Sequence, residues 1–226
     1  MKKPYIICHM MTSVDGRIDC AMTEQLPGVQ EYYDTLDSLN VPTRVSGKVT
    51  AVLEMCEPGE FRAEKSEPLG KEAFYKAADA AGYEIVTDTK GTLLWNDSEG
   101  EERPLLIVTS KQVSKEYLAY LESRHISWIA CGKERIDLVR ACEIMAAEFG
   151  VERMAVVGGG HINAGFLQAG LLDEVSILIG AGIDGRGGMA AVFDGLPMER
   201  PITQLKLTDV KPYESGAVWI RYHAAH

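Results

Sequence analysis

Cysteine is scarce in this chain and forms no arrangement that would build a disulfide framework or a zinc site. There are five cysteines among 226 residues, and no two of them have the C-x-x-C spacing. Cys8, Cys131 and Cys142 lie inside apolar segments, where a cysteine behaves as a small hydrophobic residue. The odd number and the spacing predict a reducing compartment, which we take to be the cytoplasm.

Long apolar runs and an excess of positive charge are also lacking. The apolar run after Pro4 is interrupted by His9 and ends in the polar turn at residues 13–16, so it is too short to cross a membrane. The formal net charge is −10, whereas a nucleic-acid partner would require a basic face. We therefore predict neither a membrane nor a nucleic-acid partner. A small anionic ligand remains possible because it needs only a few local cations.

The sequence does have a regular alternation of strand-like and helix-like segments. This alternation implies right-handed crossovers in a mainly parallel sheet, and the turn at residues 212–216 predicts an antiparallel hairpin at the end. No linker or repeat divides the chain, so we predict a single α/β domain over residues 1–226. The expected strands cover 4–14, 84–87, 105–108, 126–130, 154–157, 175–179, 204–210 and 218–222, the expected helices cover 31–39, 71–81, 114–124, 136–149 and 162–168, and a further apolar run covers 49–55.

Three consecutive glycines, Gly158, Gly159 and Gly160, stand where a predicted strand meets a predicted helix. Glycines let another backbone approach closely, and the free amides at a helix start bind anions such as a dinucleotide pyrophosphate. The spacing of this run is not G-x-G-x-x-G, so it is not a Rossmann fingerprint. An ordinary strand-to-helix turn would favour glycine as well. The glycine-rich residues 182–188 leave the same choice between a ligand loop and a surface loop.

Other predicted strand ends carry small hydroxyls, glycines and lysines. Ligands of open α/β sheets bind beyond the carboxyl ends of the strands, and these residue types supply the donors that a phosphate-rich ligand requires. The residues concerned are Thr12, Ser13, Asp15 and Gly16 after the first strand, Arg44, Ser46, Gly47 and Lys48 before residue 49, Thr109, Ser110 and Lys111, and Gly132 and Lys133.

The order of several segments resembles the riboflavin-biosynthesis reductase family, which is the reductase domain of a bifunctional deaminase–reductase. The segments are Met-Thr-Ser-Val-Asp-Gly-Arg-Ile at 11–18, Ser-Gly-Lys-Val-Thr at 46–50, residues 86–88 and 107–110, the glycine run at 158–160, Gly-Leu-Leu-Asp-Glu-Val at 170–175, and residues 179–188. The resemblance implies a dihydrofolate-reductase-like fold with three α/β/α layers. No H-x-E with a P-C-x-x-C partner occurs, so the deaminase half is not represented.

This sequence departs from the family pattern in three places. His9 stands where the family often has a lysine, Lys48 replaces an arginine, and residues 20–70 match poorly. Substrate contacts often lie in that poorly matching region, so the resemblance describes the cofactor side of the site better than the substrate side.

The resemblance implies NADPH as the cofactor and hydride transfer to a ribosylamino-pyrimidine phosphate such as 5-amino-6-(5-phosphoribosylamino)uracil. A solvated surface lysine is the alternative for Lys48 and Lys111. The implied cofactor residues are Gly47, Lys48 and Thr50 near the phosphates, Ser110 and Lys111 with Thr109 near the 2′-phosphate, and Gly158, Gly159, Gly160, His161 and Ile162 at the pyrophosphate. The implied substrate residues are His9, Thr12, Ser13, Asp15 and Glu174.

Reduction of a ring-opened imine requires protonation of its nitrogen, so an acid is expected close by. Asp15 and Glu174 are the catalytic candidates. The alternative for Asp15 is a turn, because Asp-Gly is a favoured turn pair, and the alternative for Glu174 is an ion pair or a cap. His9, in an apolar strand, fits either a satisfied core histidine or a proton relay. No second metal-type ligand accompanies His161, so we predict no metal.

Other functions remain open. A dihydrofolate reductase would share the fold and the cofactor, although Leu26-Pro27-Gly28 lacks the Leu-Pro-Trp of that enzyme. A related reductase that acts on another small carbonyl or imine is a third alternative, which a lack of turnover of both substrates would favour. A nucleotide-binding protein that has lost catalysis is the alternative from a different class. The resemblance also implies a homodimer, and the C-terminal hairpin has alternating apolar residues that suit an interface.

Overall fold

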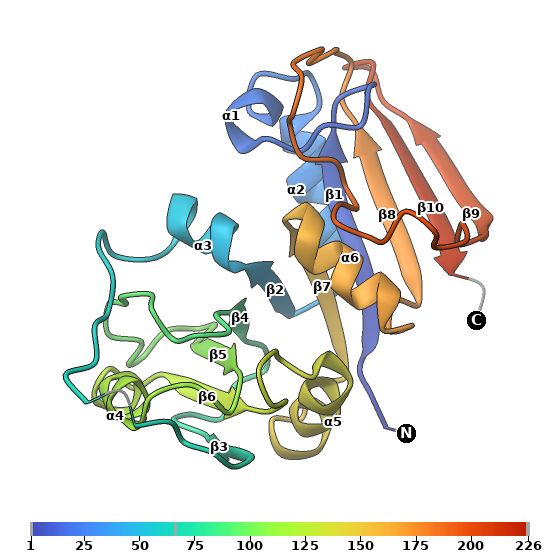
Figure 1. Ribbon diagram of the computed structural model, residues 1–226. Coiled ribbons are helices and arrows are strands. Elements are labelled where there is room, and N and C mark those ends of the chain that lie inside the picture. Colours follow the sequence, from blue (N-terminus) through green and yellow to red (C-terminus); the bar gives the residue numbers. More distant parts are fainter. Residues whose placement is uncertain (1, 66, 225–226) are drawn as a thin grey trace. The chain divides into compact units, whose positions relative to one another are not determined.

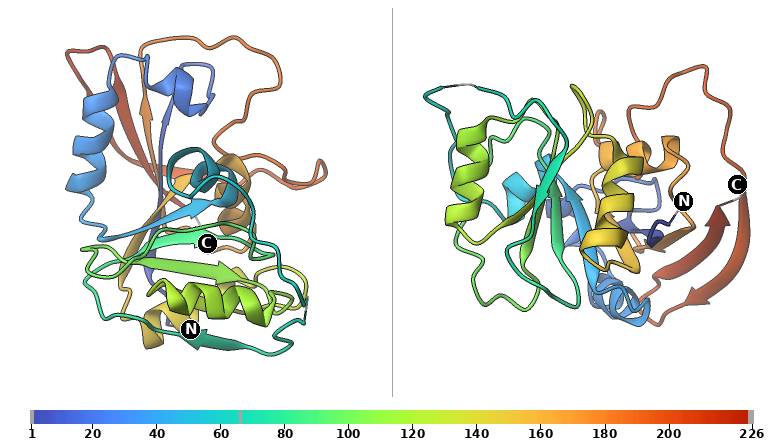
Figure 2. Two further views of the ribbon diagram at one scale, coloured as in Figure 1. Left: turned by 90° about the vertical axis from the view of Figure 1, so that its left-hand side faces the viewer. Right: turned by 90° about the horizontal axis from the view of Figure 1, so that it is seen from below.

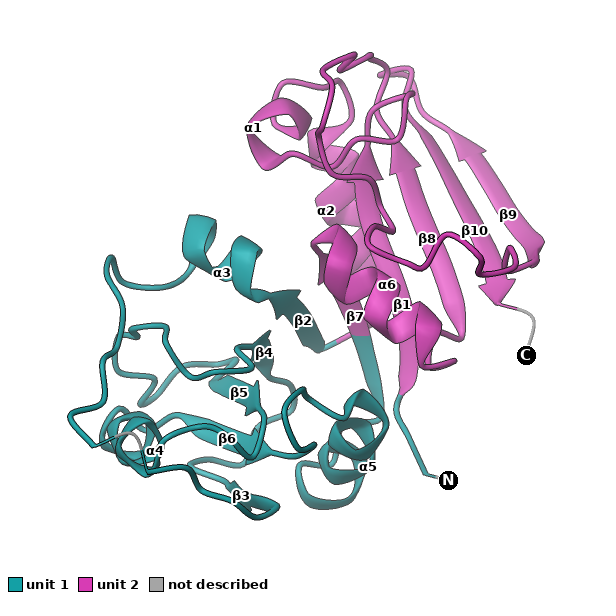
Figure 3. Ribbon diagram, in the orientation of Figure 1, with its two compact units in different colours: residues 1–4, 42–154 teal, residues 5–41, 155–226 magenta. Residues whose placement is uncertain are grey.

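The computed structural model describes residues 2–65 and 67–224, and the chain forms two compact units (Figure 3). Unit 1 takes residues 1–4 and 42–154, and unit 2 takes residues 5–41 and 155–226. Both units are discontinuous in the sequence, so no composition change or linker marks their boundaries. The single domain expected over residues 1–226 stays a prediction.

Unit 1 is a short sheet with helices on both faces. Its strand order is β3-β6-β5-β4-β2, and all neighbours are parallel except β3 and β6. Helices α4 and α5 cover opposite faces of this sheet (Figure 2). The elements are β2 (Thr43–Gly47), α3 (Lys48–Glu54), β3 (Ala73–Tyr75), β4 (Glu84–Thr87), β5 (Leu105–Thr109), α4 (Lys115–Ser123), β6 (Ser127–Ala130) and α5 (Leu138–Glu148).

The helix ends of unit 1 follow from local side-chain chemistry. The hydroxyl of Ser114 accepts a hydrogen bond from the Tyr117 amide at 3.1 Å, and the carboxylate of Asp137 accepts one from the Arg140 amide at 3.0 Å. Both side chains satisfy amides that a helix start leaves unpaired. Gly150, with φ +67°, follows α5. The helices expected at 114–124 and 136–149 are confirmed to within a few residues.

One segment of unit 1 differs from the sequence expectation, and one apolar run that the sequence left unassigned forms a helix. The helix expected at 71–81 is wrong, because residues 73–75 form the edge strand β3, antiparallel to β6. Pairing with a neighbouring strand overrides the helix propensity of its alanines. The apolar run at 49–55 lies in helix α3 except for its last residue, and strand β2 directly precedes this helix. The side chains of Val49, Val52 and Leu53 are exposed, so this run does not form a buried strand.

Unit 2 combines a parallel pair of strands with an antiparallel hairpin. Its strand order is β7-β1-β8-β10-β9; β1 and β8 are parallel, and β10 is antiparallel to both β8 and β9. Helices α2 and α6 lie on opposite faces of the sheet (Figure 1). The elements are β1 (Tyr5–Thr12), α1 (Cys20–Thr23), α2 (Val29–Ser38), β7 (Arg153–Gly158, whose first two residues belong to unit 1), α6 (Gly160–Gln168), β8 (Glu174–Ile179), β9 (Leu205–Pro212) and β10 (Val218–Ala224).

The architecture confirms the α/β class, the mostly parallel strands and the C-terminal hairpin that the sequence predicts. Among the described residues, none of the helices combines the length and the apolar character that a bilayer crossing requires.

Candidate functional site

The carboxyl ends of parallel strands meet at one edge of the unit 1 sheet. Gly47 is in register with Thr87, and Thr87 is in register with Val108. Lys48 and residues 109–111, which come next in the chain, therefore lie at the same edge, where ligands of open α/β sheets bind. The predicted cofactor residues with numbers up to 111 thus lie at one edge of the unit 1 sheet.

Lys48 is held at this edge by two partners. Its ammonium donates a hydrogen bond to the hydroxyl of Thr92 and lies 3.8 Å from a carboxylate oxygen of Asp88. The Lys48 side chain is 42% exposed, whereas that of Asp88 is 1% exposed. The lysine is therefore neither a freely solvated side chain nor a buried one. Thr50, in the first turn of α3, is half-buried.

The hydroxyls of Thr109 and Ser110 point toward the protein interior. Both side chains are fully buried, and both donate to the carbonyl of Thr89, at 3.1 Å and 2.9 Å. They tie the β4–β5 connection to the end of β5, so in this arrangement their hydroxyls are engaged by the backbone. Lys111 is half-buried, and its amide donates to the carbonyl of Gly132 at 3.0 Å.

In unit 2, the glycine run ends β7 and begins α6. Gly158 has φ +139°, and the peptide bond between Gly158 and Gly159 is cis. The amides of Ile162 and Asn163 both donate to the carbonyl of Gly159 at 3.1 Å. The earlier amides of a helix have no partner within the helix and are available to an anion.

The connection between β8 and β9 packs on this helix start. A Cβ atom on Gly160 would lie 2.4 Å from the Ala191 carbonyl oxygen. The amide of Asp194 donates to the Gly160 carbonyl at 3.2 Å, and the Asn163 side chain donates to the carbonyl of Val192 at 2.8 Å. His161 is exposed, and its Nδ1 lies 3.1 Å from the Asp194 carbonyl. Gly160 is therefore required by close packing of the chain on itself.

Asp15 anchors the same connection to the turn after β1. One carboxylate oxygen accepts from the Ser13 hydroxyl at 2.7 Å and from the Asp184 amide at 2.9 Å, and the other accepts from the Gly185 amide at 3.0 Å. These hydrogen bonds, led by that from Ser13, lower the pKa of the Asp15 carboxyl to about 2. Asp15 is ionised at neutral pH, so it is suited to accept hydrogen bonds and unsuited to donate a proton.

The two residues before this turn are directed inward. Thr12 and Ser13 are buried. The Thr12 hydroxyl donates to the Ser13 carbonyl at 2.6 Å, and the Ser13 hydroxyl accepts from the Arg17 amide at 3.1 Å. Their hydroxyls shape the turn that presents Asp15. Their substrate-binding role stays a prediction.

Glu174 has a structural partner and lies far from the strand end that ligands use. Its carboxylate is buried and lies 2.5 Å from the Arg221 guanidinium, which raises the Arg221 pKa. Tyr5 donates to its other oxygen at 3.3 Å. Glu174 opens β8, five residues before Ile179 ends the strand, and at 3.3 Å per residue that is roughly 17 Å. The geometry supports the ion pair, and the catalytic role stays a prediction.

His9 belongs to a buried polar network between β1, β8, β10 and α2. Its Nδ1 lies 2.9 Å from the Ser176 hydroxyl, which accepts from Trp219 Nε1 at 2.8 Å. Its Nε2 lies 3.3 Å from the Tyr32 carbonyl, and a neutral ring with its proton on Nε2 satisfies both contacts by donating to that carbonyl and accepting from Ser176 at Nδ1. The ring stacks on Tyr32 with an interplanar angle of 8°. Of the two interpretations of His9, the geometry supports the satisfied core histidine.

Sequence reasoning missed the partners that hold the predicted residues. Asp88 enters the sequence analysis only within the segment 86–88 that resembles the family, and nothing in the sequence marks Thr92 as the partner of Lys48. Gly180, Gly182 and Gly185 do have G-x-G-x-x-G spacing. They follow β8, however, and no helix begins between β8 and β9 in the described residues. The helix that must follow this motif is therefore missing.

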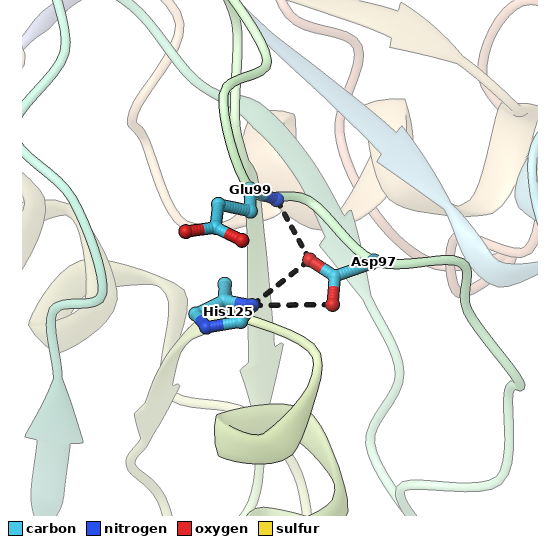
Figure 4. Close-up of side chains that lie close together, drawn as sticks. All are labelled: Asp97, Glu99 and His125. Carbon is cyan, nitrogen blue, oxygen red and sulfur yellow. Dashed lines mark hydrogen bonds and ion pairs between the residues drawn. The ribbon is translucent and has the colours of Figure 1, made fainter.

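An exposed cluster of Asp97, Glu99 and His125 lies elsewhere in unit 1 (Figure 4). Nδ1 of His125 lies 2.9 Å from one oxygen of the Asp97 carboxylate, which raises the His125 pKa. The Glu99 amide donates to the same carboxylate and, with His125, lowers the Asp97 pKa. These contacts account for the positions of the histidine and of Asp97 without a metal ion. The absence of a metal site stays a prediction.

Comparison with known proteins points to one family. The family model described as "RibD C-terminal domain" matches residues 4–219. A 2,5-diamino-6-ribosylamino-4(3H)-pyrimidinone 5′-phosphate reductase from Methanothermobacter thermautotrophicus is 28% identical over 116 residues, which are 51% of this chain and 53% of that protein. The match therefore spans about half the length of this curated relative.

Solved structures with the same fold cover nearly the whole chain. A pyrimidine reductase-like protein from Corynebacterium diphtheriae has a TM-score of 0.74 at 16% identity, covering 99% of this chain and 92% of that one. A diaminohydroxyphosphoribosylaminopyrimidine deaminase/5-amino-6-(5-phosphoribosylamino)uracil reductase from Thermotoga maritima has a TM-score of 0.64 at 14% identity, covering 99% of this chain and 57% of that one. At these identities the likeness shows the fold alone, and it confirms the predicted fold class.

Proposed function

The chain belongs to the RibD C-terminal domain family, and on that premise we propose that it is a nicotinamide-dependent reductase of a ribosylamino-pyrimidine phosphate. The observation that carries this proposal is the family match over residues 4–219. The Methanothermobacter and Thermotoga proteins are named as reductases of such compounds, which supports the substrate class.

We propose NADPH as the cofactor, which when bound supplies the hydride that reduces the ribosyl carbon. Each unit has a feature that fits a phosphate-bearing cofactor. In unit 1, Lys48 presents a partly exposed ammonium at the edge of the sheet. In unit 2, glycines open the nine-residue helix α6, whose first amides favour an anion.

The reduced nitrogen of the substrate must take up a proton, and neither predicted catalytic carboxylate is suited to donate it. The pKa of Asp15 is about 2, and Glu174 is ion-paired with Arg221 at the amino end of β8. We therefore retain Asp15 as an ionised acceptor on the substrate side and assign Glu174 to the ion pair.

A ligand panel with a turnover assay tests this proposal. We expect NADPH to raise the melting temperature more than NADH or a flavin, because a ligand that binds only the folded state stabilises it. We also expect NADPH oxidation that depends on a ribosylamino-pyrimidine phosphate, tried with the diamino-pyrimidinone and the amino-uracil forms. Turnover of dihydrofolate alone would make the chain a dihydrofolate reductase. Cofactor binding without any turnover would favour an inactive nucleotide-binding protein, and a shift by flavin alone would contradict the nicotinamide assignment.

We further propose that the chain forms a homodimer through the β9–β10 hairpin. All eight residues of β9 are exposed. Leu205, Leu207 and Val210 pair with Ala224, Tyr222 and Ile220, so their side chains share one face of the hairpin. Apolar patches of this kind on a soluble protein commonly mark an interface.

The charges of β9 favour a second copy of this chain as the partner. Lys206 and Asp209 pair with His223 and Arg221, so both lie on the face opposite the aliphatic residues. If two β9 strands paired antiparallel about a twofold axis placed between Leu207 and Thr208, each Lys206 would face an Asp209 of the other copy, and each Leu205 would face a Val210. A twofold interface requires this self-complementarity.

Sedimentation velocity tests the dimer. We expect the natural protein to sediment as a dimer and Leu207→Asp to sediment as a monomer, because the carboxylate would lie among the aliphatic side chains that the two paired β9 strands bring side by side. Met198→Asp is the matched control, since Met198 is 95% exposed outside the hairpin, and it should remain dimeric. A monomeric natural protein, or a dimeric Leu207→Asp variant, would refute this interface.

A further inference from the structure

The loop at residues 88–93 of unit 1 connects the predicted cofactor residues to one another. On one side, the Thr89 carbonyl accepts hydrogen bonds from the hydroxyls of Thr109 and Ser110. On the other side, the Thr92 hydroxyl accepts from Lys48, which begins α3. The sequence assigned no role to this loop, yet its conformation determines where these side chains lie.

Asp88 determines the conformation of the loop. It is 1% exposed, and one of its carboxylate oxygens, Oδ2, accepts from the amides of Thr92 at 2.6 Å and Leu93 at 2.9 Å. The hydroxyl of Tyr117 lies 3.5 Å from the same oxygen. This one side-chain oxygen thus holds two amides of the loop, and the Gly91 amide adds a hydrogen bond to the backbone carbonyl of Asp88 at 3.1 Å.

The other oxygen of Asp88 faces Lys48. This atom, Oδ1, accepts no hydrogen bond from any residue that the structure describes, and the Lys48 ammonium lies 3.8 Å from it. A buried carboxylate oxygen without a hydrogen bond is costly unless an opposite charge lies near it. The position of Lys48 is therefore coupled to the charge of Asp88.

We infer that Asp88 is a positioning residue for cofactor binding, an inference that rests on the proposed function. Its Oδ2 closes the loop, and its Oδ1 holds the Lys48 ammonium at the sheet edge. An ammonium has three N–H donors. With one donated to Thr92 and one directed at Asp88, the third is offered to a phosphate oxygen of the cofactor.

This arrangement strengthens binding by fixing Lys48 before the cofactor arrives. A lysine in solvent loses rotamer freedom when it binds a phosphate, and a lysine that is already held loses less. Asp88 itself touches neither substrate nor cofactor in this account. Its removal should therefore change cofactor affinity and leave the chemical step unchanged.

Asp88→Asn is the decisive substitution because it preserves the loop and removes the charge. The amide oxygen can still accept from Thr92 and Leu93, whereas the amide group then faces Lys48 with N–H donors. We expect the Kd and KM for NADPH to rise roughly tenfold, as for one lost preorganised contact, with kcat within about twofold of the natural value. In a Lys48→Gln background the same substitution should have no further effect on Kd.

Two results would overturn the inference. One is a natural NADPH affinity in Asp88→Asn. The other is an Asp88→Asn effect that is undiminished in the Lys48→Gln background, because it would show that Asp88 acts through the fold and not through Lys48.

A measurement without cofactor separates this inference from the proposed function. Labelling of Lys48 by an amine-reactive reagent, read by peptide mass spectrometry, should be several-fold faster in Asp88→Asn than in the natural protein. Asp88→Ala should in addition accelerate hydrogen exchange of the Thr92 and Leu93 amides. If the natural protein binds neither NADPH nor NADH, the proposed function fails. Unchanged labelling of Lys48 would overturn the positioning role whether or not a cofactor binds.

Discussion

Gly160→Ala is expected to lower reductase turnover about a hundredfold, the loss that a shift of roughly 1 Å in positioning can cause. The added Cβ would lie 2.4 Å from the Ala191 carbonyl oxygen and 3.0 Å from the Asp194 Cβ. These are backbone and near-backbone atoms, so the start of α6 and the β8–β9 connection must move apart. We expect the free energy of unfolding to fall by about 1–3 kcal/mol, as in other overpacked sites. Steady-state kinetics and chemical denaturation measure the two effects.

Gly187→Ala is the matched control for this substitution. Gly187 lies in the same β8–β9 connection, and a Cβ there would meet no atom within 4 Å. We expect its turnover and stability to equal those of the natural protein. A Gly160→Ala variant with natural turnover and stability would show that close packing at the glycine junction does not position the site.

Arg221→Met is expected to reduce the free energy of unfolding by about 3 kcal/mol, the low end of the range for breaking a buried ion pair. Glu174 would remain buried with the Tyr5 hydroxyl, 3.3 Å away, as its polar side-chain partner. We choose the low end because the Arg221 side chain is 31% exposed, so water can compensate part of the loss. Urea denaturation measures this change.

Glu174→Gln distinguishes the ion pair from the catalytic role. If Glu174 is a structural partner of Arg221, the variant is less stable but turns over at the natural rate under conditions where it is folded. The double variant Glu174→Leu with Arg221→Met should recover much of the stability, because both charges are then gone. A Glu174→Gln variant that keeps its stability and loses kcat would restore the catalytic assignment.

The elements that the sequence predicts well are those whose burial and ends are determined locally. Residues 84–87 form β4 as expected, because a short apolar segment is bounded by turn residues. The helices around 114–124 and 136–149 follow from apolar spacing together with Ser114, Asp137 and Gly150 at their ends. Residues 71–81 fail because the strand β3 depends on pairing with β6, about fifty residues later in the chain.

The candidate site is predictable in its residue types and less so in their roles. Lys48 and Gly160 lie at a strand end and a helix start as expected. The burial of Asp88, which couples it to Lys48, and the pairing of Glu174 with Arg221 depend on contacts between segments distant in the chain. The two units were not foreseen because each is assembled from separated stretches of sequence.

Isotope transfer from the cofactor tests the central claim most directly. NADPH deuterated at the transferred position of the nicotinamide is incubated with the protein and the ribosylamino-pyrimidine phosphate, and the product is examined by mass spectrometry. The account predicts one deuterium on the former ribosyl C1′, with the accompanying proton taken from water. A product without deuterium, or no product despite cofactor binding, would contradict the assignment of this chain as a nicotinamide-dependent pyrimidine reductase.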